Sequence, residues 1–447
     1  MRALVVIALV AQPLVAAAAQ GPPLVAAARA GDMAEVRALV ASGAEVDAAA
    51  PEGATALHWV SYHDEVETLD LLLSAGADVG AVSDLGVSAL WTASENGSAA
   101  AVERLLEAGA DPDRALLSGE TPLMVAARSG AADVVGLLLA AGADTEARAT
   151  RGQTALMWAV AQRHPEVVQA LVEGSADLHA RSDVWSQMMA VPPHGQPEYN
   201  REIPHGGNTA LMFAARVGDL ASARRLLEAG ANPDDTDAWG VSATTLAAHA
   251  GFGDLVTVLL EAGADPSAAE AGFAALHVAV MRRDPGMVAT LLAHGADPNA
   301  PLRTWTPTRR SSRDFNFAPP LVGATPFWLA ARFNAPDVMR LLAEHGADAA
   351  FVHHADYKDP SYAQPRQEAT TAIMAAIGMG GGRLRSWNPP DRAEVELLRL
   401  ETVRAAVELG ADVRATDLFG LTAIDQARSV SFDAVADYLE SQLAPGQ

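Results

Sequence analysis

Residues 67–82 read ETLDLLLSAGADVGAV, a leucine-rich segment that ends in Gly76-Ala77-Asp78. Closely related endings begin every 33 residues along the first part of the chain, at Gly43, Gly76, Gly109, Gly142 and, as a variant, Ser175. Further copies begin at Gly230, Gly263, Gly295, Gly346 and Gly410. A repeat of fixed length in the range of roughly 20–50 residues is typical of solenoids and related arrays.

Length and composition restrict the possible architectures. The 447 residues exceed what one hydrophobic core usually holds, so the chain forms either several domains or one elongated array. Aromatic residues make up only 5%, and Gly and Pro recur at regular places, which predicts short helices joined by turns. The formal net charge of −24 repels phosphate backbones, so we expect no nucleic-acid binding.

The first 20 residues, MRALVVIALVAQPLVAAAAQ, have the layout of a secretory signal peptide. Arg2 precedes an apolar stretch that ends in the small residues Ala17-Ala18-Ala19. We therefore expect residues 1–19 to be a signal peptide, and the protein to be periplasmic or secreted, with no stable membrane span after signal removal. The alternative is a cytoplasmic or N-terminally anchored protein. Because the chain has no Cys, disulfides, thiol catalysis and Cys-based zinc sites are excluded.

One repeat, residues 119–148, contains the signals of two helices. Thr121 suits a helix N-cap and Pro122 the first helical position, while Gly130 suits the end of that helix. A valine- and leucine-rich second helix follows and ends at Gly142. Two short helices cannot bury so much apolar surface alone, so neighbouring repeats must stack on each other.

The pattern G-x-T-P-L-x-x-A-A, followed by V-V-x-L-L-L-x-x-G-A-D, resembles the ankyrin repeat. It stands almost intact in residues 119–144, 207–232 and 323–348. The resemblance implies an all-α fold, an α-solenoid whose unit is a helix-turn-helix plus a finger loop. It also implies protein binding as the role, without enzymatic activity or cofactor.

About eleven units fill residues 20–440. They lie near 22–50, 51–83, 84–116, 117–149, 150–182, 207–238, 239–271, 272–300, 323–350, 369–416 and 417–443. The first and last units are expected to be caps. Four insertions interrupt the period, at 183–206, 301–322, 351–368 and 381–399.

The insertions are rich in aromatic residues, unlike disordered segments, so we expect them to be ordered against the repeats. The fourth insertion reads as a backward extension of a second helix, which Pro390 and Asp391 would start. The second insertion carries a basic group, formed by Arg303, Arg309, Arg310 and Arg313. Such a group either pairs with the acidic repeats or recognises an acidic partner.

In the ankyrin layout, finger tips and the exposed ends of the first helices face the concave side. Aromatic residues and Arg are favoured interface anchors, and further polar positions lie beside them. The candidate protein-binding residues are Tyr62, His63, Glu95, Asn96, Arg128, Arg216, Trp239, His249, Arg282, Trp305, Arg309, Arg310, Arg332 and Phe333.

Histidines are the remaining candidates for chemistry. His58 and His277 follow Leu in TALHW and AALHV, where the resemblance implies a structural hydrogen-bonding role. His353, His354 and Asp356 are weak candidates for a metal site, because their spacing matches no regular ligand pattern. We therefore predict no metal.

These observations predict a non-enzymatic scaffold that binds another protein through the concave face and the insertions. The alternative is an exported ankyrin protein whose insertions enclose a small-molecule or metal site. The partner's identity is not encoded in any recognisable motif.

Overall fold

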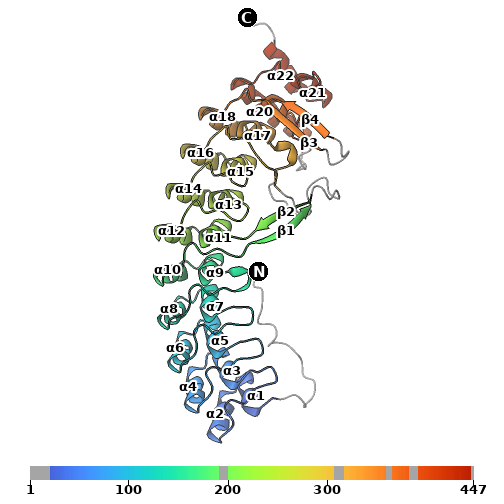
Figure 1. Ribbon diagram of the computed structural model, residues 1–447. Helices are drawn as coiled ribbons and strands as arrows, with labels where there is room; N and C mark the ends of the chain where they lie inside the picture. Colours follow the sequence, from blue (N-terminus) through green and yellow to red (C-terminus); the bar gives the residue numbers. More distant parts are fainter. Residues whose placement is uncertain (1–20, 191–199, 307–316, 359–364, 382–390, 444–447) are drawn as a thin grey trace. The chain divides into compact units, whose positions relative to one another are not determined.

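The computed structural model describes residues 21–190, 200–306, 317–358, 365–381 and 391–443. The predicted signal peptide and the candidates Arg309 and Arg310 lie outside these ranges. The chain divides into two compact units: unit 1 holds the residues up to 150 together with 154–176, and unit 2 holds 151–153 and the chain from 177 onward. The described residues form 22 α-helices and four short strands. Within each unit the helices stack in two rows (Figure 1).

In unit 1, the first helix of each repeat packs on the first helix of the next. This row consists of α1 (Pro23–Ala30), α3 (Ala56–Tyr62), α5 (Ala89–Asn96), α7 (Pro122–Ser129) and α9 (Ala155–Ala161). The second helices form the other row. They are α2 (Met33–Ala41), α4 (Val66–Ser74), α6 (Ala99–Glu107), α8 (Ala132–Ala140) and α10 (Pro165–Glu173).

Unit 2 repeats this arrangement. Its first helices are α11 (Ala210–Val217), α13 (Ala243–Ala250), α15 (Ala275–Arg282), α17 (Pro326–Arg332), α19 (Ala372–Ala376) and α21 (Ala423–Ser429). Its second helices are α12 (Leu220–Glu228), α14 (Gly253–Glu261), α16 (Pro285–Ala293), α18 (Pro336–Glu344), α20 (Arg392–Glu408) and α22 (Asp433–Leu443). Each of the eleven repeats expected from the sequence therefore contains one helix pair.

The predicted helix signals operate as expected in α7. The Thr121 side chain accepts the N–H of Met124 over 3.3 Å, and Pro122 occupies the first turn. Gly130 ends the helix in the left-handed conformation, with φ of 84°. Val134, Val135 and Leu138 of the following helix are fully buried between the rows.

The Gly-Ala-Asp ending, or a close variant of it, follows each second helix from α2 to α20. Gly142 has a φ of 88°, which glycine adopts without the steric cost that a side chain brings. The N–H of Ala143 then donates back to the carbonyl of Leu138 over 3.0 Å. Ser175, the variant, has a φ of 65°, so the turn persists where the glycine is missing.

The Asp of this ending forms two kinds of hydrogen bond. Asp144 Oδ1 accepts the N–H of Glu146 over 2.8 Å, which fixes the turn locally. The N–H of Asp144 donates to Asp113 Oδ1 of the preceding repeat over 2.8 Å. Equivalent inter-repeat bonds run from Asp78 to Asp47 and from Asp265 to Asp234, each over 2.7 Å. The finger loops are thereby held in register along the stack.

Two buried histidines also connect repeats to the following finger loop. His58 Nδ1 accepts the N–H of Thr55 over 3.1 Å, and its Nε2 donates to the carbonyl of Val87 over 2.9 Å. His277 bonds in the same way to Ala274, over 3.1 Å, and to Ala300, over 2.9 Å. These contacts match the structural role that the resemblance implied.

The first and third insertions form β-hairpins, which the sequence patterns did not predict. Strand β1 (Trp185–Ala190) pairs antiparallel with β2 (Asn200–His205), with Trp185 opposite His205. Strand β3 (His353–Lys358) pairs with β4 (Pro365–Thr370), with His353 opposite Thr370. The regular secondary structure of the described residues is thus mostly helical, with two small two-stranded sheets.

The other two insertions contain helical segments. The second contains the short 3-10 helix η4 (Pro319–Leu321), and its Phe317 ring packs 5.8 Å from the ring of Phe273, measured between centroids. In the fourth, Asp391 caps α20 by accepting the N–H of Ala393 over 3.0 Å. Helix α20 has 17 residues, against nine in α18, as the backward extension predicted.

Among the helices of the described ranges, none combines the length and the apolar character that a membrane crossing requires.

Leu138→Ala should destabilise the protein because it leaves a cavity between the two helix rows. Leu138 is fully buried, so we expect a loss of roughly 2–5 kcal/mol in the free energy of unfolding. Urea denaturation followed by circular dichroism measures this loss. The half-exposed Leu139 of the same helix is the matched control, and Leu139→Ala should cost clearly less. Equal costs for the two variants would contradict the facing of α8.

His277 should make stability fall on acidification. Burial lowers its pKa to about 4, against an ordinary value of 6.5, with partial opposition from its bonds to Ala300 and Ala274. The unfolded chain therefore binds more protons between these two pH values, and the folded state loses on the order of 3 kcal/mol between pH 6.5 and pH 4. Urea midpoints of the wild type should decline over this window more steeply than those of His277→Asn. Parallel declines would show that His277 does not titrate as its burial requires.

Candidate protein-interaction surface

In unit 1, the candidate contact residues lie at the carboxyl ends of the first helices and the turns that follow. Together with three neighbours that the sequence did not single out, they form what we call the first-helix surface. It consists of Arg29, Tyr62, His63, Glu95, Asn96, Arg128 and Trp158, with the buried Trp59 in contact with Arg29 and Tyr62. The repeat geometry places these side chains side by side, because each first helix stacks on the next.

Two arginines of this surface lie over the tryptophan of a following repeat. The Arg29 guanidinium carbon is 4.9 Å from the ring centroid of Trp59, and the Arg128 carbon is 5.0 Å from that of Trp158. Both distances suit a cation–π interaction. In each case the Arg precedes the Trp by 30 residues. That spacing is the signal by which the sequence could have identified Trp59 and Trp158.

Arg128 also pairs with two carboxylates. Its guanidinium nitrogens lie 3.4 Å from Glu95 and 3.6 Å from Glu120. Burial raises the pKa of Glu95, the positive charge of Arg128 opposes this rise, and the negative charge of Glu120 adds to it. The two carboxylates and the Trp158 ring therefore fix the Arg128 side chain from several sides.

Tyr62 is the exposed aromatic residue of this surface, with 39% of its area accessible. Its ring meets the ring of Trp59 edge-on, with centroids 6.0 Å apart, and the ring of His63 at 5.3 Å. Edge-to-face contacts of this kind are favourable and restrict the ring's motion. Tyr62 is thus an exposed aromatic side chain whose orientation is fixed by its neighbours.

Other candidates of unit 1 satisfy backbone groups at helix ends. Asn96 Nδ2 donates to the carbonyl of Tyr62 over 2.8 Å, and His63 Nε2 donates to the carbonyl of Arg29 over 3.3 Å. Carbonyls in the last turn of a helix lack partners within the helix, so such bonds stabilise the stack. Asn96 and His63 therefore serve the fold as well as the surface.

The candidate residues on the first helices of unit 2 also include exposed side chains and side chains that donate hydrogen bonds within the stack. Arg216 is exposed and donates to Asn208 Oδ1 over 3.0 Å. Arg282 donates to the carbonyl of His249 over 2.9 Å, and the His249 side chain is exposed. These three residues lie on successive first helices, α11, α13 and α15, as the repeat pattern predicted.

The tryptophan candidates of unit 2 are half-buried. The Trp239 ring meets the buried Phe273 ring edge-on at 5.8 Å, and Phe273 continues to Phe317 of the second insertion. Trp305 lies in the same insertion and is also half-buried. The second insertion is therefore packed on the preceding repeat through aromatic contacts.

Arg332 and Phe333 are buried, which corrects the expectation that they lie on an exposed helix end. Arg332 Nε donates to the carbonyl of Gly380 over 3.1 Å, because the third and fourth insertions cover the end of α17. Burial, and then the charge of Arg399, lower the pKa of Arg332 to about 10, with opposition from Glu368. Arg332 remains charged at neutral pH.

A polar core surrounds Arg332 and connects the insertions. Tyr357 donates to Glu368 Oε1 over 2.7 Å, and the N–H of Gly381 donates to Glu368 Oε2 over 3.1 Å. Burial and the hydrogen bond to Glu368 raise the pKa of Tyr357. Since these groups bond to each other and to the backbone, the arrangement is that of a buried structural network.

The strand geometry separates the three weak metal candidates. His353 is fully buried on one face of β3, where its Nε2 donates to the carbonyl of Pro320 over 3.0 Å. His354 and Asp356 are exposed, and alternation along the strand places Asp356 on the opposite face from His353. The three side chains do not converge. In the described ranges, no group of three or more His, Asp or Glu side chains could hold a metal ion.

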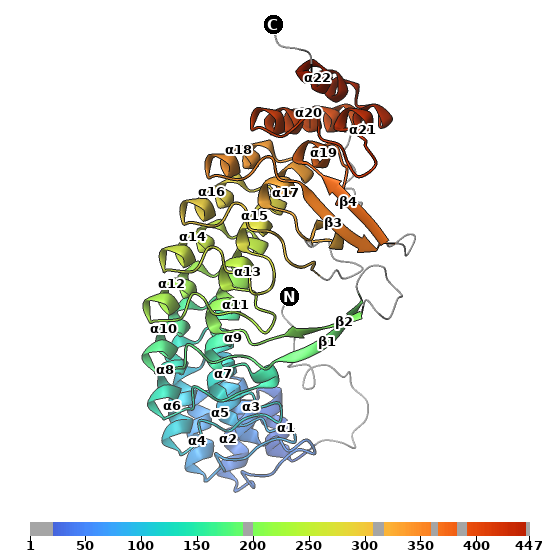
Figure 2. The ribbon, with the colours of Figure 1, turned by 45° about the horizontal axis from the view of Figure 1, so that its top comes forward.

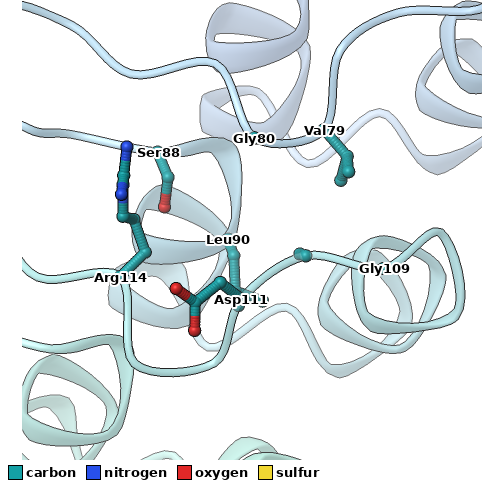
Figure 3. A pocket seen from close by; sticks show the side chains of 8 residues that line it. Val79, Gly80, Ser88, Leu90, Gly109, Asp111 and Arg114 are labelled. Carbon is teal, nitrogen blue, oxygen red and sulfur yellow. The ribbon is translucent and has the colours of Figure 1, made fainter.

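A shallow pocket lies between two finger loops of unit 1 (Figure 3). Its volume is about 190 Å³, below the roughly 300–1,000 Å³ of small-molecule sites. The lining residues are Val79, Gly80, Ser88, Leu90, Gly109, Ala110, Asp111 and Arg114. This volume is smaller than that of a typical cofactor site.

Comparisons with known proteins agree with this architecture. The family model described as Ankyrin repeats (3 copies) matches residues 9–83, 89–182 and 211–301. The model described as Ankyrin repeat matches residues 322–351. Comparison with curated proteins gives no match. More than half of the chain is covered by the first model, and the helix pairs stack as that repeat requires, so the chain belongs to the ankyrin repeat family.

Proposed function

We propose that this protein is a non-enzymatic scaffold that binds another protein through the first-helix surface of unit 1, with contributions from the finger loops. Ankyrin repeats are in general protein-interaction modules, which supports the role but not the particular surface. The observation that carries the proposal is the set of oriented side chains Arg29, Tyr62, Arg128 and Trp158 on four of the five repeats of unit 1. Residues of these three types dominate the energetics of protein interfaces.

Preorganisation supports the same assignment. Tyr62 is flanked by two rings, and Arg128 is held by Trp158 and two carboxylates. A side chain that is already fixed loses less conformational entropy on binding than a mobile one. Tyr62 and Arg128 are therefore the residues from which we expect the largest contributions to affinity.

The binding test compares the full chain with Tyr62→Ser and Arg128→Gln. Each chain is immobilised and exposed to an extract of the native source, and retained proteins are quantified by mass spectrometry. A partner that binds this surface should be retained by the wild type and lost by both variants. With that partner purified, calorimetry should show Kd values weaker by about 30-fold or more, as expected for anchor residues.

Arg104→Gln is the matched control, because Arg104 lies on α6 in the other helix row and pairs with Asp70 and Glu107. It should retain the partner at wild-type affinity. Urea midpoints of all variants separate lost binding from lost folding. A partner that binds Tyr62→Ser and Arg128→Gln as tightly as the wild type would overturn the proposed surface.

The cellular location is also a proposal, supported by the residue pattern of the N-terminus. Export would expose the repeats to an envelope or extracellular partner. Mass spectrometry of the protein purified from its source should then find a mature chain that begins close to residue 20. A mature protein that retains residues 1–19 would contradict cleavage.

A further inference from the structure

The two hairpins of unit 2 differ in how their strand edges are protected. Strand β3 packs on η4, and the β3–β4 hairpin carries the exposed residues Asp356 and Arg366 and begins β4 with Pro365. Charges and prolines on edge strands prevent further strands from adding. Strand β1, by contrast, has the sequence WSQMMA, without a charge or a proline.

Strand β1 is also exposed. Val184 immediately before it is 62% accessible, Trp185 is 39% accessible and Met188 is 61% accessible. In both views, the β1–β2 hairpin extends away from α11 (Figures 1 and 2). Within the described part of the chain, the only strand that pairs with β1 is β2. The other edge of β1 therefore presents backbone N–H and C=O groups without a strand partner.

The outer edge of β2 is less suited to pairing. Pro204 has no N–H to donate, and Glu202 places an exposed carboxylate beside it. Trp185 stacks on His205 of β2 with centroids 4.5 Å apart, and Arg151 lies 5.4 Å from the Trp185 ring, which fixes the start of the hairpin. Among the described residues of this hairpin, the edge of β1 is thus the one open to a further strand.

An open strand edge is complemented by an extended backbone, and the uncharged side chains of β1 require an uncharged partner strand. A second copy of β1 meets both requirements. Two chains that each carry a net charge of −24 repel one another, so a contact between copies must avoid bringing like charges together. No charged residue lies between Val184 and Ala190.

We propose that β1 pairs antiparallel with β1 of a second copy, with Met188 opposite its symmetry mate, forming a four-stranded sheet in the order β2–β1–β1′–β2′. The contact is two-fold symmetric and uses the same strand of both copies, so it closes at a dimer. The β2 strands become the outer edges, where Pro204 and Glu202 oppose further growth. This self-association is independent of partner binding by the first-helix surface.

Sedimentation velocity of the purified full chain tests the proposal over a range of protein and salt concentrations. A monomer–dimer equilibrium is expected at micromolar concentrations, because a six-residue strand pair is a small interface. Added salt should strengthen the dimer, since it screens the repulsion between two acidic chains. A contact between opposite charges would instead weaken with salt.

Met188→Lys and Met188→Glu each place a like charge against its symmetry mate, so each should weaken dimerisation by roughly tenfold or more. An equimolar mixture of the two variants should recover a dimer, because unlike charges then meet across the symmetry axis. Glu202→Lys is the matched control, since Glu202 is opposite Met188 on the same hairpin but on the outer strand. It should dimerise at least as well as the wild type.

Three results would overturn the proposal. The wild type remains monomeric at high concentration and high salt, the Met188 variants dimerise like the wild type, or assembly continues beyond the dimer. Circular dichroism spectra of the variants should match that of the wild type. A mixture of Met188→Lys and Met188→Glu that stays monomeric while both spectra match the wild type would be a fourth such result.

Discussion

The turn at each Gly-Ala-Asp ending is the constraint on which the rest of the structure depends. The glycine ends the second helix, and the Asp side chain fixes the turn. The N–H of the same Asp donates to the Asp of the preceding finger loop, as Asp144 does to Asp113. This register decides which side chains meet between repeats. The Arg29–Trp59 and Arg128–Trp158 pairs, 30 residues apart, follow directly from it. Equivalent side chains on this surface therefore recur at the spacing of the repeat.

The insertions use the same scaffold differently. Phe317 extends the aromatic contacts of Trp239 and Phe273, while the third and fourth insertions enclose Arg332 beside Glu368 and Gly380. Their aromatic residues therefore serve mainly as packing in the described regions. Hairpin β1–β2 is the exception, since Trp185 and Met188 remain accessible. Within unit 2, the added residues thus form both new core and new surface.

Much of the fold could be predicted from the sequence because its signals are local. Thr121, Pro122, Gly130 and Gly142 each act within one turn, and Asp391 likewise starts α20 as expected. The β-hairpins were missed because neither insertion has a strong alternating pattern or a recognisable two-residue turn. For the candidate contacts, the repeat pattern placed Tyr62 and Arg128 at helix ends. The burial of Arg332 could not be predicted, since it depends on where two distant insertions fold back.

Helix α20 links the last two repeats more strongly than stacking alone. Its added N-terminal turns bring Arg392 to the carbonyl of Val430, over 2.5 Å, and Glu396 to the N–H of Ala434, over 2.7 Å. Arg399 lies 4.8 Å from the ring centroid of Phe432. Under a mechanical load applied at the C-terminus, α21 and α22 would therefore not peel away as a single repeat. Release of the terminal pair requires α20 to give up its contacts at the same time, so the end of the array resists fraying as one cooperative block.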